Sequence, residues 1–144
     1  ILLQRSGTNQ PIKTPAVKES NDTSKDKKIL IIEDEQEARE AIGYLFYGFR
    51  IEVAPNKAEA IDKIAAFHPD VITLDLGLGN DDGRDILRWM NNTGNKIPTV
   101  VVSGEIENDD DETAQELIAL GALKTHKKPF NEDKLYADVM SILQ

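Results

Sequence analysis

The stretch Asp70-Val71-Ile72-Thr73-Leu74-Asp75 decides the fold of this chain. Its apolar centre is short and continuous, which predicts a strand that is buried on both faces, as in a parallel sheet. Asp75 closes the run and therefore lies at the carboxyl end of the strand, where open α/β sheets bind their ligands. A carboxylate there loses hydration unless a cation or a donor meets it, so the neighbouring strand ends matter.

Four further strands accompany this one, and segments with helical periodicity separate them; three are apolar runs, whereas the last, 123–126, is short and polar and is expected at the edge of the sheet. The other strands are expected at 29–32, 51–53, 97–102 and 123–126. Five helices are expected to bury the following residues: Ala38, Ile42, Leu45 and Phe46; Ile61, Ile64 and Ala65; Ile86, Leu87 and Met90; Ala114, Leu117, Ile118 and Gly121; Leu135, Val139 and Ile142. This alternation predicts an α/β fold, namely a doubly wound five-stranded parallel sheet with right-handed crossovers.

Helix ends are also marked in the sequence. Asn56 and Asn131 precede the second and fifth helical segments and are expected to be N-caps, because their side-chain oxygens can accept free backbone N–H groups. Gly48 is expected to close the first helix, since glycine tolerates the left-handed conformation found there.

Composition divides the 144 residues into a tail and one domain. Residues 1–26 mix polar residues with two prolines and lack apolar periodicity, so a flexible linker or tail is predicted there. Residues 27–144 are predicted to form a single domain. A linker before the domain, and a last helix that runs to Gln144, favour the C-terminal domain of a longer chain.

Charge and residue usage exclude several classes of function. The chain has 26 acidic and 17 basic residues, which argues against direct nucleic-acid binding because phosphate contacts need a basic face. It has no cysteine, so disulfides, thiol catalysis and thiolate metal sites are excluded. No apolar run approaches the roughly 20 residues of a membrane span, so no membrane contact and a cytoplasmic location are expected.

Charged and polar side chains follow four of the predicted strands. Glu33 and Asp34 follow the first, Asp75 the third, Ser103 the fourth and Lys128 the fifth. Because carboxyl ends of parallel strands share one edge, these groups are expected to converge. Three carboxylates in contact need a cation or a proton, and oxygen ligands suit Mg²⁺. A lysine there can pair with an acid or a phosphoryl group, and a carboxylate can attack phosphorus.

The motifs resemble the receiver domain of two-component response regulators. The resemblance covers residues 28–144, and four motifs in order make it specific although each alone is weak. These motifs are Ile31-Ile32-Glu33-Asp34-Glu35, Asp75 with Gly83 eight residues later, Val102-Ser103-Gly104, and Lys128-Pro129-Phe130.

The resemblance implies a flavodoxin-like sheet of strand order 2-1-3-4-5 and a cis peptide between Lys128 and Pro129. It implies that Asp75 accepts a phosphoryl group from the phosphohistidine of a histidine kinase or histidine phosphotransfer protein. Lys128 and Ser103 would contact phosphoryl oxygens. Mg²⁺ would be held by Glu33, Asp34, Asp75 and the backbone carbonyl of Gly77.

The chain departs from the family's pattern at four places. Gly79 stands where proline is usual, which predicts a looser loop after Asp75. Ser103 replaces the commoner threonine and keeps the hydroxyl. The loop Glu105–Glu112 is longer and more acidic than usual, and Thr125 replaces an aromatic residue on the fifth strand. The last two differences concern output rather than phosphoryl chemistry.

Alternative functions remain beside phosphoryl transfer. The domain is expected to belong to a hybrid sensor kinase; the alternatives are a free-standing regulator that acts by partner binding and a degenerate receiver used only for protein interaction. A phosphatase with an aspartyl nucleophile would need a second acid two residues after Asp75, where Gly77 stands. The sequence predicts neither the oligomeric state nor the cognate kinase.

Overall fold

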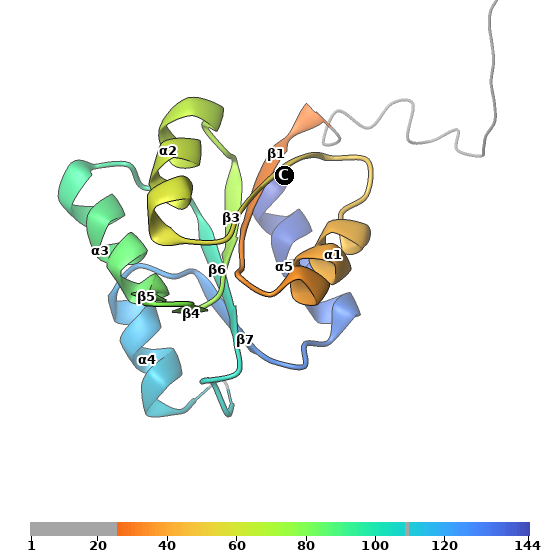
Figure 1. Ribbon diagram of the computed structural model, residues 1–144. Coiled ribbons are helices and arrows are strands. Elements are labelled where there is room, and N and C mark those ends of the chain that lie inside the picture. The colour runs from red at the N-terminus through yellow and green to blue at the C-terminus, as the bar shows by residue number, and fades with distance from the viewer. Residues whose placement is uncertain (1–25, 109) are drawn as a thin grey trace, which may run out of the picture.

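A five-stranded parallel sheet forms the centre of the computed structural model, which describes residues 26–108 and 110–144 (Figure 1). The predicted linker falls almost wholly within residues 1–25, outside the described part. In spatial order the strands are β2 (Arg50–Ala54), β1 (Lys28–Ile32), β3 (Val71–Leu74), β6 (Thr99–Ser103) and β7 (Lys124–Lys127). Counting only these five strands along the chain, the order is 2-1-3-4-5, so the predicted fold class is confirmed.

Five helices cover the two faces of this sheet. On one face lie α1 (Gln36–Leu45) and α5 (Glu132–Leu143), and on the other lie α2 (Lys57–Phe67), α3 (Gly83–Thr93) and α4 (Glu112–Ala119), as Figure 1 shows. A hydrophobic core lies on each face of the sheet, and alternate residues of β1 point into one core or the other. Ile29 and Ile31 pack with the α1 and α5 side, whereas Leu30 and Ile32 pack with the α2, α3 and α4 side. In the described part, no helix is long and apolar enough to cross a membrane.

The two predicted N-cap residues have their predicted roles. The side chain of Asn56 accepts a hydrogen bond from the Glu59 N–H at 2.9 Å and begins α2. The side chain of Asn131 accepts one from the Lys134 N–H at 2.9 Å and begins α5. The C-cap of α1 is Phe46 and not Gly48 as predicted; Gly48 lies two residues further on, in the turn after the helix, with a φ of 99° that favours glycine.

The prediction of the buried face of α2 was wrong at one position. Ala65 is exposed, while Ala60 and Ile64 are buried. Residues four apart share a helix face, so the Ala60–Ile64 pair directs the neighbouring Ala65 to solvent.

The prediction for α4 was wrong at two positions. This helix has only eight residues and buries Ala114 and Leu117. Ile118 keeps 49% of its surface exposed, because the position next to Leu117 turns away from the sheet. Gly121 lies beyond the helix with a φ of 114°, so it is part of the turn into β7 and not of a helix face.

The segment after β3, predicted as a loop, contains a small antiparallel hairpin. It consists of β4 (Gly77–Leu78) and β5 (Asp81–Asp82), joined by Gly79 and Asn80. Leu78 is 1% exposed and anchors the hairpin in the core shared with α2 and α3. The hairpin therefore has a fixed place beside the end of β3.

Gly83 allows α3 to begin directly against the end of β3. A Cβ atom at this position would lie 2.3 Å from the carbonyl oxygen of Asp75, a distance that no side chain tolerates. The Gly83 N–H also donates to the Leu76 carbonyl at 2.8 Å. Glycine at this position thus lets the backbone after Asp75 turn tightly.

Candidate functional site

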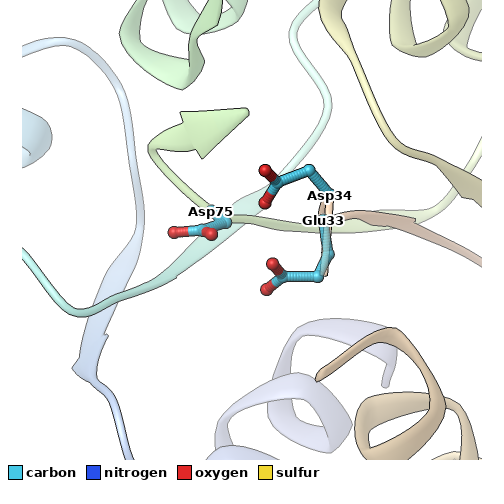
Figure 2. Close-up of side chains that lie close together, drawn as sticks. All are labelled: Glu33, Asp34 and Asp75. Atoms are coloured by element: carbon cyan, nitrogen blue, oxygen red, sulfur yellow. The ribbon is translucent and has the colours of Figure 1, made fainter. Parts of the chain in front are cut away.

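Three carboxylates meet at the carboxyl edge of the sheet, as predicted. Glu33 and Asp34 follow β1 and Asp75 follows β3, and their carboxylate groups point to the same side in Figure 2. One oxygen from each lies within 4.8 Å of the others. Glu33 is 1% and Asp75 8% exposed, whereas Asp34 is exposed, so the cluster opens to solvent at Asp34.

Backbone hydrogen bonds beyond the regular strands hold two of these acids in place. The Glu33 N–H donates to the Ala54 carbonyl at 3.0 Å, and the Asp75 N–H donates to the Ile32 carbonyl at 3.0 Å. Because these bonds continue the pattern of the sheet, the two carboxylates are attached to a rigid support.

Lys128 joins the two buried acids. Its Nζ donates to Glu33 Oε1 at 2.7 Å and to Asp75 Oδ2 at 3.1 Å. Although burial lowers the pKa of Lys128, its hydrogen bonds and its attraction to Glu33 and Asp75 outweigh burial and raise that pKa above the usual value. The ammonium is therefore charged. The peptide bond between Lys128 and Pro129 is cis, as the resemblance implied.

Glu33 is the acid of the cluster whose pKa is raised. Burial raises its pKa above the ordinary value, against the hydrogen bond from Lys128, and the charge of Asp75 adds to the rise. The cluster thus has three carboxylates facing one ammonium. An added divalent cation would offset the remaining negative charge, and an all-oxygen donor set fits Mg²⁺.

Ser103 lies at the end of β6 and is 1% exposed. Its Oγ accepts a hydrogen bond from the Glu105 N–H at 3.2 Å, and its backbone carbonyl accepts one from the Lys128 N–H at 3.1 Å. Among the described residues, the hydroxyl has this partner and no carboxylate of the cluster. Ser103 is therefore joined to the site through the backbone of Lys128.

Two residues near the acids have roles that were not predicted. Arg39 Nη1 donates to the backbone carbonyls of Glu33 and Asp34, each at 3.0 Å, and so fixes the chain that carries both acids. The Gly79 N–H donates to Asp34 Oδ2 at 3.1 Å. The only sequence signal for the role of Arg39 was its position in the first helix, shortly after the two acids. Gly77, the predicted metal ligand, lies in β4, next to the turn that contains Gly79.

Arg84 connects the loop after Ser103 with two helices. Its guanidinium contacts Glu105 at 3.4 Å, Glu116 of α4 at 3.0 Å and Asp82 at 3.3 Å, and its side chain is 15% exposed. Although burial acts to lower the pKa of Arg84, Glu116 and Asp82 outweigh burial and raise it. A polar connection thus runs from the edge of the site to α4.

Together the fold and the site define a class: flavodoxin-like α/β domains with an acidic cluster and a lysine at the carboxyl edge of the sheet. Residues 29–140 match the family described as the response regulator receiver domain. The chain belongs to this family, whose members act in two-component signalling. Receiver domains interact with histidine kinases or phosphotransfer proteins and generally bind Mg²⁺.

Curated relatives include the response regulator MprA of Mycobacterium avium, which is 29% identical over 121 residues. The match covers 81% of this chain and 51% of MprA, so the chain spans about half the length of that relative.

Solved relatives include the signal receiver domain of a putative Luxo repressor protein from Vibrio parahaemolyticus, 26% identical with a TM-score of 0.75. That match covers 82% of this chain and 90% of the other. The signal receiver domain of a response regulator from Bermanella marisrubri is 28% identical with a TM-score of 0.72, over 83% of this chain and 99% of the other.

Proposed function

We propose that Asp75 accepts a phosphoryl group from a phosphohistidine and that the domain then passes the group on or loses it by hydrolysis. The observation that carries this proposal is the position of Lys128, whose Nζ lies 3.1 Å from Asp75 Oδ2 and 2.7 Å from Glu33 Oε1. A lysine in that position can neutralise a phosphoryl oxygen as well as the acid beside it. The donor would be a histidine kinase or a histidine phosphotransfer protein.

Asp75 is better suited to this reaction than the other two acids. Glu33 is almost wholly buried with its pKa raised, and Asp34 already accepts the Gly79 N–H. Asp75 is 8% exposed against 1% for Glu33, and it is followed by a loop with two glycines, which leaves room for in-line approach. In the transfer, a carboxylate oxygen bonds to phosphorus while the phosphorus–nitrogen bond breaks, and the histidine nitrogen keeps the electron pair of that bond.

We assign the metal site to the carboxylates of Glu33, Asp34 and Asp75 and to the backbone carbonyl of Gly77. The three carboxylates support this assignment because one oxygen from each lies within 4.8 Å of the others, while the Lys128 ammonium contacts only Glu33 and Asp75 among them. Bound Mg²⁺ would supply positive charge for phosphoryl oxygens.

The hydroxyl of Ser103 would donate a hydrogen bond to a phosphoryl oxygen. Its Oγ acts only as an acceptor in the described contacts, toward the Glu105 N–H, so its own proton is available for a new bond. Ser103 and Lys128 would then hold two oxygens of the transferred group from neighbouring strand ends.

The proposal is tested by incubation with phosphoramidate or acetyl phosphate and Mg²⁺, followed by intact mass spectrometry. The chain should gain one phosphoryl group, and EDTA should prevent the gain. Asp75→Asn keeps the size of the side chain but removes the nucleophile, so it should abolish the gain. Asp85→Asn, which alters a carboxylate on α3 that pairs with Arg88, is the matched control and should react as the wild type does. A variant with Asn at position 75 that reacts at the wild-type rate would contradict the assignment.

We also infer that the domain relays phosphoryl groups rather than driving an attached output domain. The support is Thr125, which is partly buried on β7 and has no aromatic ring that could move on phosphorylation.

A further inference from the structure

Asp34 is the exposed acid of the cluster, yet its carboxylate is held by a residue 45 positions away. The Gly79 N–H donates to Asp34 Oδ2 at 3.1 Å. Gly79 is the first of the two residues that join β4 and β5, and its φ is +68°. A two-residue hairpin turn with glycine first and a positive φ is typical of type II′.

The hairpin that presents this N–H is attached at three points. Leu78 is buried in the core, and Asp81 Oδ2 accepts the N–H of Lys57, the first residue of α2, at 3.1 Å. At the end of the hairpin, the Gly83 N–H donates to the Leu76 carbonyl at 2.8 Å. The prediction of a looser loop therefore overlooked a hydrogen bond that a proline at position 79, which lacks an N–H, could not make.

We propose that the β4–β5 hairpin is a positioning arm for the divalent cation: the Gly79 N–H fixes the carboxylate of Asp34 before the metal arrives. The inference rests on the proposed metal site. Arg39 fixes the backbone at Glu33 and Asp34, whereas Gly79 fixes the Asp34 side chain, so the two contacts act on different torsions.

The hydrogen bond leaves Asp34 able to bind a metal. An ionised carboxylate has about four acceptor positions, and the N–H occupies one of them on Oδ2. The donor also places partial positive charge beside a carboxylate that Glu33 and Asp75 repel. Metal-ligating carboxylates are commonly held in this way, and loss of such an outer contact typically weakens metal affinity by about 10- to 100-fold.

Gly79 is required for its backbone conformation and not for space. A Cβ atom there would meet nothing within 4 Å, but a φ of +68° is a region that side chains rarely adopt. Proline at this position would remove the N–H and impose a φ near −65°, so Gly79→Pro removes the donor directly.

The test is a calorimetric titration of the whole chain with Mg²⁺ alone. In Gly79→Pro the dissociation constant should rise about tenfold. Gly94→Ala is the matched control for backbone strain, because Gly94 also has a positive φ of +76° and open space but lies at the far end of α3. It should lower the melting temperature while leaving the dissociation constant unchanged. A wild-type dissociation constant in Gly79→Pro would overturn the inference.

Asp34→Ala separates this inference from the proposed function. Wild-type Mg²⁺ affinity in Asp34→Ala would refute the proposed metal site itself. Loss of binding in Asp34→Ala with wild-type binding in Gly79→Pro would refute only the positioning arm.

Amide exchange measured by NMR gives a second readout, which remains if Gly79→Pro does not fold. Without metal, the Gly79 amide hydrogen should exchange faster in Asp34→Ala than in the wild type, because its acceptor is gone. Its NMR signal should also change position. An unchanged Gly79 amide in Asp34→Ala would overturn the inference.

Discussion

Lys128 is the residue on which the balance of charge at the site depends. Its ammonium contacts Glu33 and Asp75, two acids that are almost completely buried. A buried acid that loses its partner keeps the cost of desolvation without the attraction that offset it. The same ammonium therefore serves both the stability of the metal-free fold and the proposed chemistry.

Replacing Lys128 with methionine tests this dual role. Lys128→Met keeps an unbranched apolar side chain but removes the ammonium and leaves Glu33 and Asp75 facing each other, so the free energy of unfolding without metal should fall by about 3 kcal/mol. Urea unfolding in EDTA measures the change. Adding Glu33→Gln, which removes one of the two charges, should restore part of the loss. An unchanged stability in Lys128→Met would show that the pair contributes nothing to the fold.

The residues of the site differed in how far the sequence could predict them. Glu33, Asp34 and Asp75 were found because they follow apolar strands, and Lys128 because it follows the short polar strand at the edge; the ends of parallel strands must meet. The contact between Gly79 and Asp34 was not predicted, because it depends on the conformation of a turn 45 residues away from its acceptor.

At the scale of elements, helix starts were predictable because a cap is a local feature. Asn56 caps α2 through the Glu59 N–H, and its amide also donates to the Glu59 carboxylate at 3.2 Å. The hairpin of β4 and β5 was not predictable, since two-residue strands are too short to show alternation of apolar and polar residues. Short elements likewise explain the error at Ile118, because an eight-residue helix offers few positions that define its buried face.

Loss of the α2 cap should weaken the fold without affecting the site. Asn56→Ala leaves the Glu59 N–H without its acceptor, so the free energy of unfolding should fall by about 1 kcal/mol. Asn92→Ala is the matched control, because Asn92 is exposed within α3, where alanine favours the helix. Chemical denaturation measures both variants. Equal stability of Asn56→Ala and the wild type would show that the cap contributes little.

At the scale of the whole molecule, the relay inference concerns the face formed by α4, β7 and α5. A cavity of about 830 Å³ lies on this face, and its lining includes Ile118, Leu123 and Thr125. Thr125 has no ring that could fill the space left behind if Ser103 moves toward a phosphoryl group. Arg84 is a polar connection between the site and this face, because it contacts both Glu105 after Ser103 and Glu116 of α4.

A phosphoryl group shifts an equilibrium between two conformations only by the difference in its contacts with them. Without an aromatic ring at position 125, we expect that difference to change the face of α4, β7 and α5 only weakly. Beryllofluoride with Mg²⁺, used in place of the phosphoryl group, should therefore shift amide NMR signals strongly only near the site. Strong shifts are expected near Asp34, Asp75, Ser103 and Lys128, and weak ones from Ala114 to Gly121 and in α5. Large shifts across α4 and α5, or dimerisation through that face, would contradict the relay function. Repeating the titration with Arg84→Met would then test whether Arg84 transmits the change from the site to α4. If the shifts in α4 vanish in this variant, the contacts of Arg84 with Glu105 and Glu116 take the place of the missing aromatic ring.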